Sequence, residues 1–295
     1  MKKIKNRSLR LESLEDRMLL AVTAGGEAAA AELVAPAETG AEIVVNQLSF
    51  NALRSAIVSK AQDGDTIVFA DGLEGTIEAT SYINIAKNIT IDGGGKITIR
   101  GAGENNLLNI TKSCTFTGLT FENGYSASAG LGGIGAIGDG VSVTLNNCNI
   151  VGNTAETEAN AAGAFYVTGQ LYMNNCNVYG NTAVDGGFAF IYGRDNHGAA
   201  LVDATNCTFY GNTASDSGGV IRNMGGTVNL TNCTVVGNKA QDGAIANFEF
   251  FAVGGSDDAW TDEFWISNTT ITNSIIAYNV STDEATADIY TDYTA

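Results

Sequence analysis

The chain has 295 residues, among them 36 glycines and one proline, and a net charge of −17. Six of its 15 basic residues but only three of its 32 acidic residues lie in the first 20 positions, so the remainder is more acidic still. Such a charge repels phosphate backbones and argues against nucleic-acid binding, and no apolar run reaches the ~18 residues of a transmembrane helix.

Residues 1–24 are basic and then briefly apolar. The apolar stretch from Met18 to Thr23 is shorter than the ~7–15 residues of an ordinary signal peptide, and acidic residues precede it. The segment RLESLEDRMLLA resembles instead the LEPR-XLL export-associated motif of large bacterial surface proteins, with Asp16 where that motif has proline. The resemblance implies an exported protein. Residues 25–44 are rich in Ala, Glu and Gly without hydrophobic periodicity, which predicts a flexible linker.

Residues 45–295 predict a single β-rich domain that begins with a short helix. Ser49 is placed to cap the N-terminus of a helix reaching about Ala61, with Phe50, Leu53 and Ile57 on one face. We expect this helix to cover the first coil, because exposed strand edges invite aggregation. No comparable cap follows the last coil in the sequence, so we expect that end to be uncapped.

Four later segments repeat one pattern, and their cysteines are spaced 28, 31 and 26 residues apart. A fifth copy, at 272–281, has Ser274 in the cysteine position. Self-similarity at a period of this length indicates a solenoid. The four segments are NNCNIVGNTA (146–155), NNCNVYGNTA (174–183), TNCTFYGNTA (205–214) and TNCTVVGNKA (231–240).

Each repeat alternates apolar and polar residues with a period of two, which is typical of a strand with one buried face. The alternation shifts by one residue at the asparagine before each cysteine, and asparagine tolerates the left-handed backbone of a bend. The fold class predicted is therefore all-β: a right-handed, single-stranded parallel β-helix, or solenoid, of about eight coils with a short N-terminal capping helix. A β-propeller is the structural rival, but the bends do not have the sequence of hairpin turns.

The repeat also predicts two internal ladders. The four cysteines should form one inward-facing column, with Cys114 outside it. Because their side chains would be parallel and Ser274 fills the same slot, free thiols are favoured over disulfides. Four asparagines should form a second ladder at the turn. The ladder residues are Cys148, Cys176, Cys207 and Cys233, and Asn153, Asn181, Asn212 and Asn238.

The repeats also resemble a known group of proteins. The motif FxxN occurs as Phe209–Asn212, with variants in the other copies, and GGA[ILV]-like partners follow, such as Gly218-Gly219-Val220-Ile221. This pairing is similar to the repeats of chlamydial polymorphic outer membrane proteins. The segments NALRSAI, GDTIVF and KNITIDGGG resemble pectin-lyase-like β-helix proteins of bacterial surfaces. The resemblance implies secretion or surface display, often with adhesion, and names no ligand.

Two insertions supply candidate binding residues. The first, 248–265, is rich in aromatic residues that could stack on sugars or anchor a partner, or could instead pack against the outside of the solenoid. The second contains the only histidine, in GRDNHG (193–198), and is either a binding patch or a polar surface loop. The candidates are Phe251, Trp260, Phe264 and Trp265 in the first, and Arg194, Asp195 and His197 in the second.

The sequence favours a non-enzymatic protein. A lyase on this fold needs clustered acids to hold Ca²⁺ and a basic residue to remove the sugar proton, but the repeated strands carry Asn, Thr and Ser outward. We expect no catalytic residue, no metal site and no cofactor. The leading hypothesis is an exported or cell-surface, adhesin-like β-helix that binds an extracellular polysaccharide or a surface protein. The alternatives are a divergent polysaccharide lyase or glycoside hydrolase, and a structural spacer.

Overall fold

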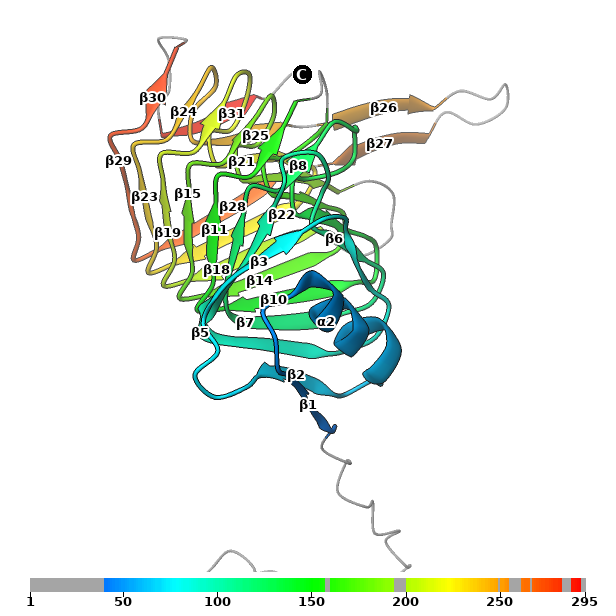
Figure 1. Cartoon of the computed structure of the whole chain (residues 1–295). Helices are drawn as coiled ribbons and strands as arrows, with labels where there is room; N and C mark the ends of the chain where they lie inside the picture. Colours follow the sequence, from blue (N-terminus) through cyan, green and yellow to red (C-terminus); the bar gives the residue numbers. More distant parts are fainter. Residues whose placement is uncertain are drawn as a thin grey trace, which may run out of the picture. The chain divides into compact units, whose positions relative to one another are not determined.

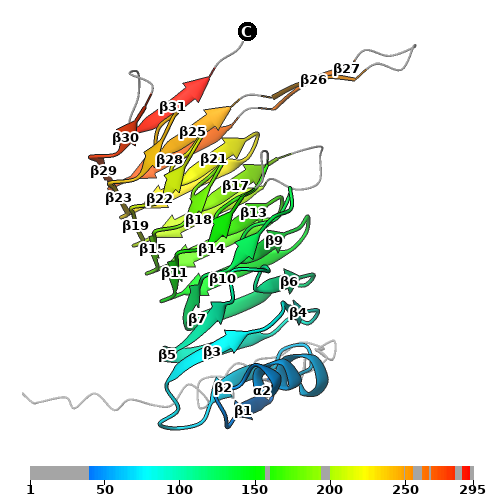
Figure 2. The same ribbon diagram turned by 45° about the horizontal axis from the view of Figure 1, so that its top comes forward.

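The computed structural model of the chain describes residues 40–156, 160–193, 200–248, 250–254, 261–265, 267–282 and 288–292. These residues form a right-handed parallel β-helix of about seven turns, with its helical segment at the N-terminal end (Figures 1 and 2). The predicted fold class is confirmed. The turns are slightly fewer than expected because the 41 residues between Cys233 and Ser274 make a single turn. No helix among the described residues is long and apolar enough to cross a membrane.

The helical segment begins where the sequence predicts. α2 (Phe50–Ser55) continues into a π-helical turn, Ala56–Lys60. The Ser49 hydroxyl caps α2 by accepting a hydrogen bond from the Ala52 amide at 3.2 Å. Phe50, Leu53 and Ile57 are buried, so one face of the segment belongs to the solenoid core.

The largest sheet contains two runs of strands that meet at a bend. The strands before the bend are β1 (Glu42–Val45), β2 (Thr66–Phe69), β5 (Thr90–Gly101), β7 (Cys114–Glu122), β10 (Ser142–Asn146), β14 (Gln170–Asn174), β18 (Leu201–Thr205), β22 (Thr227–Thr231) and β28 (Asn268–Thr272). Those after it are β3 (Gly75–Ala79), β11 (Asn149–Val151), β15 (Asn177–Tyr179), β19 (Thr208–Tyr210), β23 (Thr234–Val236) and β29 (Ile275–Ala277). β5 and β7 pass through the bend and contribute to both runs.

Two further parallel sheets complete each turn. The short one contains β8 (Tyr125–Ser126), β12 (Thr154–Ala155), β16 (Thr182–Ala183), β20 (Thr213–Ala214), β24 (Lys239–Ala240) and β30 (Val280–Ser281). The other contains β4 (Ile83–Ile85), β6 (Leu108–Ile110), β9 (Gly135–Ile137), β13 (Phe165–Val167), β17 (Ala189–Tyr192), β21 (Ile221–Met224), β25 (Ile245–Phe248) and β31 (Ile289–Asp292).

The bend is made by the predicted asparagines. Five of them have φ between 52° and 56°, in the left-handed region that asparagine tolerates better than most residues. They are Asn147, Asn175, Asn206, Asn232 and Asn273. One residue with this backbone turns the chain while leaving the apolar side chains on both flanking strands directed inward, so the core is continuous from α2 to the last turns.

The aromatic insertion forms a separate antiparallel hairpin of β26 (Phe250–Gly254) and β27 (Thr261–Trp265). It leaves the solenoid between β25 and β28, and its strands run outward from the stack of coils (Figure 2). It is the only antiparallel pair among the described strands.

Candidate functional site

The outward face of the short strands after the bend carries one aligned column of side chains. Parallel pairing places equivalent residues of successive coils side by side, at the ~4.8 Å strand spacing. Along the axis the column runs through Glu78, Arg100, Glu122, Val151, Tyr179, Tyr210, Val236 and Ala277. Its composition changes from charged at the N-terminal end to aromatic farther along.

The charged end of the column is an ion triad. Arg100 donates to Glu122 Oε2 at 2.8 Å and to Glu78 Oε1 at 3.2 Å. These bonds, chiefly the one to Glu122, raise the pKa of Arg100. All three side chains are partly or largely exposed, so the pairs contribute at most about 1 kcal/mol each to stability. Their charges leave this end of the column with one net negative charge.

The aromatic part of the column is a pair of stacked tyrosines, Tyr179 and Tyr210, here called the tyrosine ridge. Their ring centroids lie 4.7 Å apart with an interplanar angle of 9°. Tyr210 is 41% exposed. Burial, together with the nearby Tyr210 and Glu122, raises the pKa of Tyr179, so its hydroxyl keeps its proton. Neither hydroxyl has a hydrogen-bond partner among the described residues, so both remain available to a ligand.

Next to the charged end lies a cavity of about 420 Å³, here called the glycine notch. Its floor is largely backbone, because Gly101, Gly103, Gly124 and Gly152 line it without side chains. At Gly124 a Cβ would lie 2.1 Å from the Gly133 carbonyl oxygen, so no larger residue fits there without displacing the backbone. The remaining lining residues are Ala102, Asn123, Tyr125, Thr154 and Glu156.

Polar side chains are fixed at the edge of the notch. The Tyr125 hydroxyl donates to Glu156 Oε2 at 3.1 Å, and this contact is the main reason that the pKa of Tyr125 is raised. The Gly152 amide donates to the Tyr179 carbonyl at 3.1 Å, so the notch and the tyrosine ridge are on adjoining coils. The notch and the ridge lie on neighbouring coils and are here together called the outer groove, of which the notch is the concave part.

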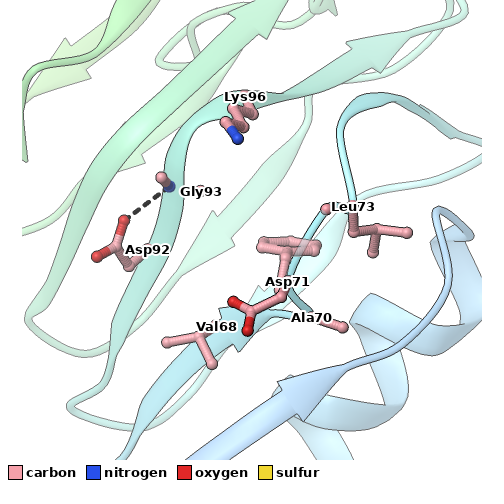
Figure 3. Close-up of a pocket in the computed structure, with 10 residues that line it drawn as sticks. Val68, Ala70, Asp71, Leu73, Asp92, Gly93 and Lys96 are labelled. Atoms are coloured by element: carbon pink, nitrogen blue, oxygen red, sulfur yellow. Dashed lines mark hydrogen bonds between the residues drawn. The ribbon is translucent and has the colours of Figure 1, made fainter.

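A second cavity, of about 260 Å³, lies near the N-terminal end (Figure 3). Asp71, from the segment after β2, and Asp92 and Lys96, on β5, line it. Asp92 Oδ1 accepts the Gly94 amide at 2.8 Å, which orients that carboxylate. Two carboxylates and one amine around a cavity could bind a polar ligand. The described residues contain no group of three or more His, Cys, Asp or Glu side chains placed to hold a metal ion.

A third charged cluster is enclosed. The Arg222 guanidinium on β21 contacts Asp185 and lies 3.5 Å from Asp216 Oδ2, between the rings of Phe190 and Phe248. Asp185 is nearly inaccessible to solvent, and its pKa is raised by burial although Arg222 opposes the shift. The arrangement joins neighbouring coils and offers little surface to a ligand.

The asparagines at the turn form a continuous buried ladder. The side-chain oxygens of Asn181, Asn212 and Asn238 each accept from both the backbone and the side-chain nitrogen of the asparagine one coil earlier, at 2.9–3.1 Å. Each side-chain nitrogen also donates to a carbonyl of an earlier coil. The ladder runs from Asn153 through Asn181, Asn212 and Asn238 to Asn279.

The cysteines form a second internal column. Cys148, Cys176, Cys207 and Cys233 are buried with free thiols, as is Cys114, which pairs with Val143 outside the column. The backbone amides of Cys176 and Cys207 each donate to the next cysteine's sulfur at 3.4 Å. Ser274 takes the following place, where its hydroxyl accepts the Cys233 amide at 2.9 Å. Both columns are structural, because they lie inside the solenoid.

The candidate residues in the insertions are only partly placed. Phe251 pairs with Phe264 across the β26–β27 hairpin, and Phe250 pairs with Trp265. Trp260 and the whole GRDNHG candidate, Arg194, Asp195 and His197, lie outside the described residues. The structure does not bring the two insertions together into one described site.

The outer groove was not predicted from the sequence, although the repeat contained a signal for half of it. Tyr179 and Tyr210 both lie three residues after a column cysteine, one position beyond the inward-facing Val178 and Phe209. Alternation therefore directs them outward on adjacent coils. The notch had no such signal, because its residues come from segments whose register the repeat does not define.

No family model matches the chain, and no curated protein matches it. Among solved structures, it is similar to a mutant of the PL6 family alginate lyase AlyGC, with 14% identity and a TM-score of 0.51. That match covers 87% of this chain and 38% of the lyase. A second AlyGC structure matches with 14% identity, a TM-score of 0.44, and coverage of 85% and 40%. The chain thus spans less than half of these proteins, and the likeness establishes the fold alone.

Proposed function

We propose that this chain is an exported, non-catalytic β-helix protein that binds an extracellular polysaccharide along its outer groove. The tyrosine ridge is the observation that carries the proposal. Paired tyrosines offer an apolar ring body and a polar tip, a combination suited to the mixed apolar and hydroxyl surface of a sugar. Their hydroxyls are unpartnered among the described residues, so sugar binding would not have to break a hydrogen bond that either hydroxyl makes there.

Other features support the same proposal. The notch adds a concave site with exposed backbone and a fixed carboxylate next to the ridge. The fold is shared with polysaccharide-acting proteins, which is compatible with a carbohydrate partner. The LEPR-XLL-like segment and the repeats that resemble polymorphic outer membrane proteins support export and surface display.

The test is affinity gel electrophoresis of the purified chain through gels that contain single polysaccharides. We expect at least one polysaccharide to retard the wild type, and the double variant Tyr179→Ala/Tyr210→Ala to lose about tenfold or more in affinity. Tyr82→Ala is the matched control, because Tyr82 is also exposed but lies outside the groove. Equal retardation of the wild type and the double variant would reject the groove as the binding surface. No retardation by any polysaccharide would favour a structural spacer.

A second candidate function, polysaccharide lyase activity, rests on the cavity in Figure 3. Lys96 could remove a sugar proton and Asp71 or Asp92, when protonated, could give one to the leaving glycosidic oxygen, which are the base and acid roles that β-elimination requires. The test is the appearance of unsaturated sugar ends on incubation with alginate or polygalacturonate. Activity that disappears in Lys96→Ala would establish this alternative, and unchanged polymers after long incubation would reject it.

A further inference from the structure

We propose that the ligand of the outer groove is an uncharged polysaccharide whose chain runs along the solenoid axis, with one sugar in the glycine notch. This inference rests on the proposed function and specifies its ligand class. It differs from what the fold neighbours suggest, because alginate, the polymer named for those lyases, is a chain of acidic sugars.

The charge of the groove disfavours an acidic polysaccharide. Its charged residues are Glu78, Glu122, Glu156 and Arg100. Arg100 is engaged by both Glu78 and Glu122, so no unpaired cation among the described groove residues can meet a sugar carboxylate. A polyanion would have to approach this surface, and a protein of net charge −17, without a compensating charge.

Among the cations outside the groove, Lys239 on β24 is exposed on the coil that follows Tyr210, whereas two others are held by protein groups. The Lys87 ammonium donates to three carbonyls, those of Ile57, Val58 and Ala61, at 2.6–3.3 Å, so it belongs to the end of the helical segment. Arg222 is enclosed by Asp185 and Asp216. Lys87 and Arg222 are therefore engaged within the protein, and a contribution from Lys239 would be seen as salt-dependent binding of an anionic polymer.

The groove instead offers neutral side-chain amides and hydroxyls. Along the neighbouring outward column, Asn149 and Asn177 are joined by a side-chain hydrogen bond of 3.1 Å, and Thr208 and Thr234 continue it. Amides and hydroxyls both donate and accept, as sugar hydroxyls do. A neutral polymer therefore finds matched partners on each coil.

The spacing of the coils favours a polysaccharide chain that runs along the solenoid axis. Equivalent groups recur along the axis at the ~4.8 Å spacing of parallel strands, which is close to the length of one pyranose unit. A polysaccharide along the axis would thus present one sugar to each coil, whereas a chain lying across the strands would meet unrelated side chains. The notch and the ridge together span several coils, from Gly101 to Tyr210.

The experiment compares a mixed-linkage β-glucan and a galactomannan, which are uncharged, with alginate and polygalacturonate, which are anionic. Each is tested by affinity electrophoresis and titration calorimetry, at low and high salt, with the anionic polymers also tested with Ca²⁺. The variants are Thr154→Trp, which fills the notch from an outward position on β12, and Thr231→Trp, a control at an outward position on β22. Tyr179→Ala/Tyr210→Ala is included.

We expect an uncharged polymer to bind the wild type with an affinity that changes less than about twofold with salt, because no ion pair is involved. Thr154→Trp should weaken that binding at least fivefold, and Thr231→Trp should leave it unchanged. Binding of an anionic polymer alone, lost in the tyrosine variant, would overturn the ligand class and leave the proposed function standing. Unaltered binding by Thr154→Trp would overturn the notch subsite. If no polymer binds through the tyrosines, the proposed function fails as well.

Discussion

The asparagine ladder gives the sharpest prediction about stability. The Asn181 side chain accepts from the backbone nitrogen of Asn153 at 3.0 Å and from its side-chain nitrogen at 2.9 Å. It also donates to the Ile150 carbonyl at 3.0 Å and to Asn212 Oδ1 at 2.9 Å. Asn181→Ala removes all of these bonds from the interior without changing the surface.

The expected cost follows from the groups left without partners. The Asn153 backbone N–H loses its acceptor, and one N–H of the Asn153 side chain does too, while the other keeps the Phe121 carbonyl at 3.2 Å. An orphaned buried donor costs about 1–3 kcal/mol, so the two together reduce the free energy of unfolding by about 2–6 kcal/mol. Water cannot readily repair the loss, because Asn153 and Asn181 are fully buried.

The assay is urea denaturation followed by circular dichroism, with Asn177→Ala as the control. Asn177 is in the same coil, but its side chain is exposed and, among the described residues, bonds only to Asn149, so its removal should cost about 0.5 kcal/mol or less. Solenoids do not always unfold in a single step, so the midpoint of the first transition is compared. Equal midpoints for Asn181→Ala and Asn177→Ala would refute the ladder's role in stability.

Three further predictions concern the interior. In native protein the five thiols should resist an aromatic disulfide reagent, because they are buried, and all five should react in denaturant. Burial also raises the pKa of Cys114 to about 12, which disfavours its reactive thiolate. Rapid reaction of the thiols in the native protein would contradict this prediction. Cys207→Ser should cost less than about 2 kcal/mol in urea unfolding, because Ser274 already fills that slot, and a failure to fold would contradict the equivalence of the two positions. Burial raises the pKa of Asp185 above its unfolded value, so the stability of the wild type relative to Asp185→Asn should rise as pH falls through the folded-state pKa. Urea midpoints of both proteins at neutral and acidic pH measure this difference in stability. A difference that stays constant with pH would refute the prediction.

The coil was predictable because its physics is local. A residue that adopts positive φ, flanked by alternating apolar residues, defines one bend and two strands, and the repeat shows that bend five times, from Asn147 to Asn273. The Ser49 cap is likewise a local signal. The number of turns was less predictable, because insertions such as the β26–β27 hairpin lengthen a coil without adding one.

The candidate site was much less predictable. The tryptophans of the insertion are the more conspicuous aromatic residues in the sequence, whereas Tyr179 and Tyr210 form a pair only through stacking across a 31-residue interval. The notch depends on what is missing: Gly124 takes the place that asparagine holds in the following coils, which is visible only once the coils are in register. The FxxN motif therefore indicates the fold and leaves the ligand surface to the outward residues between its repeated positions.

Calorimetric titration of the wild type and of Tyr179→Ala/Tyr210→Ala with an uncharged β-glucan or galactomannan tests the central claim most directly. The account predicts salt-independent binding by the wild type and a loss of about tenfold or more in the variant. Binding of equal strength in both proteins would contradict it, as would the absence of binding to uncharged polymers when alginate binds.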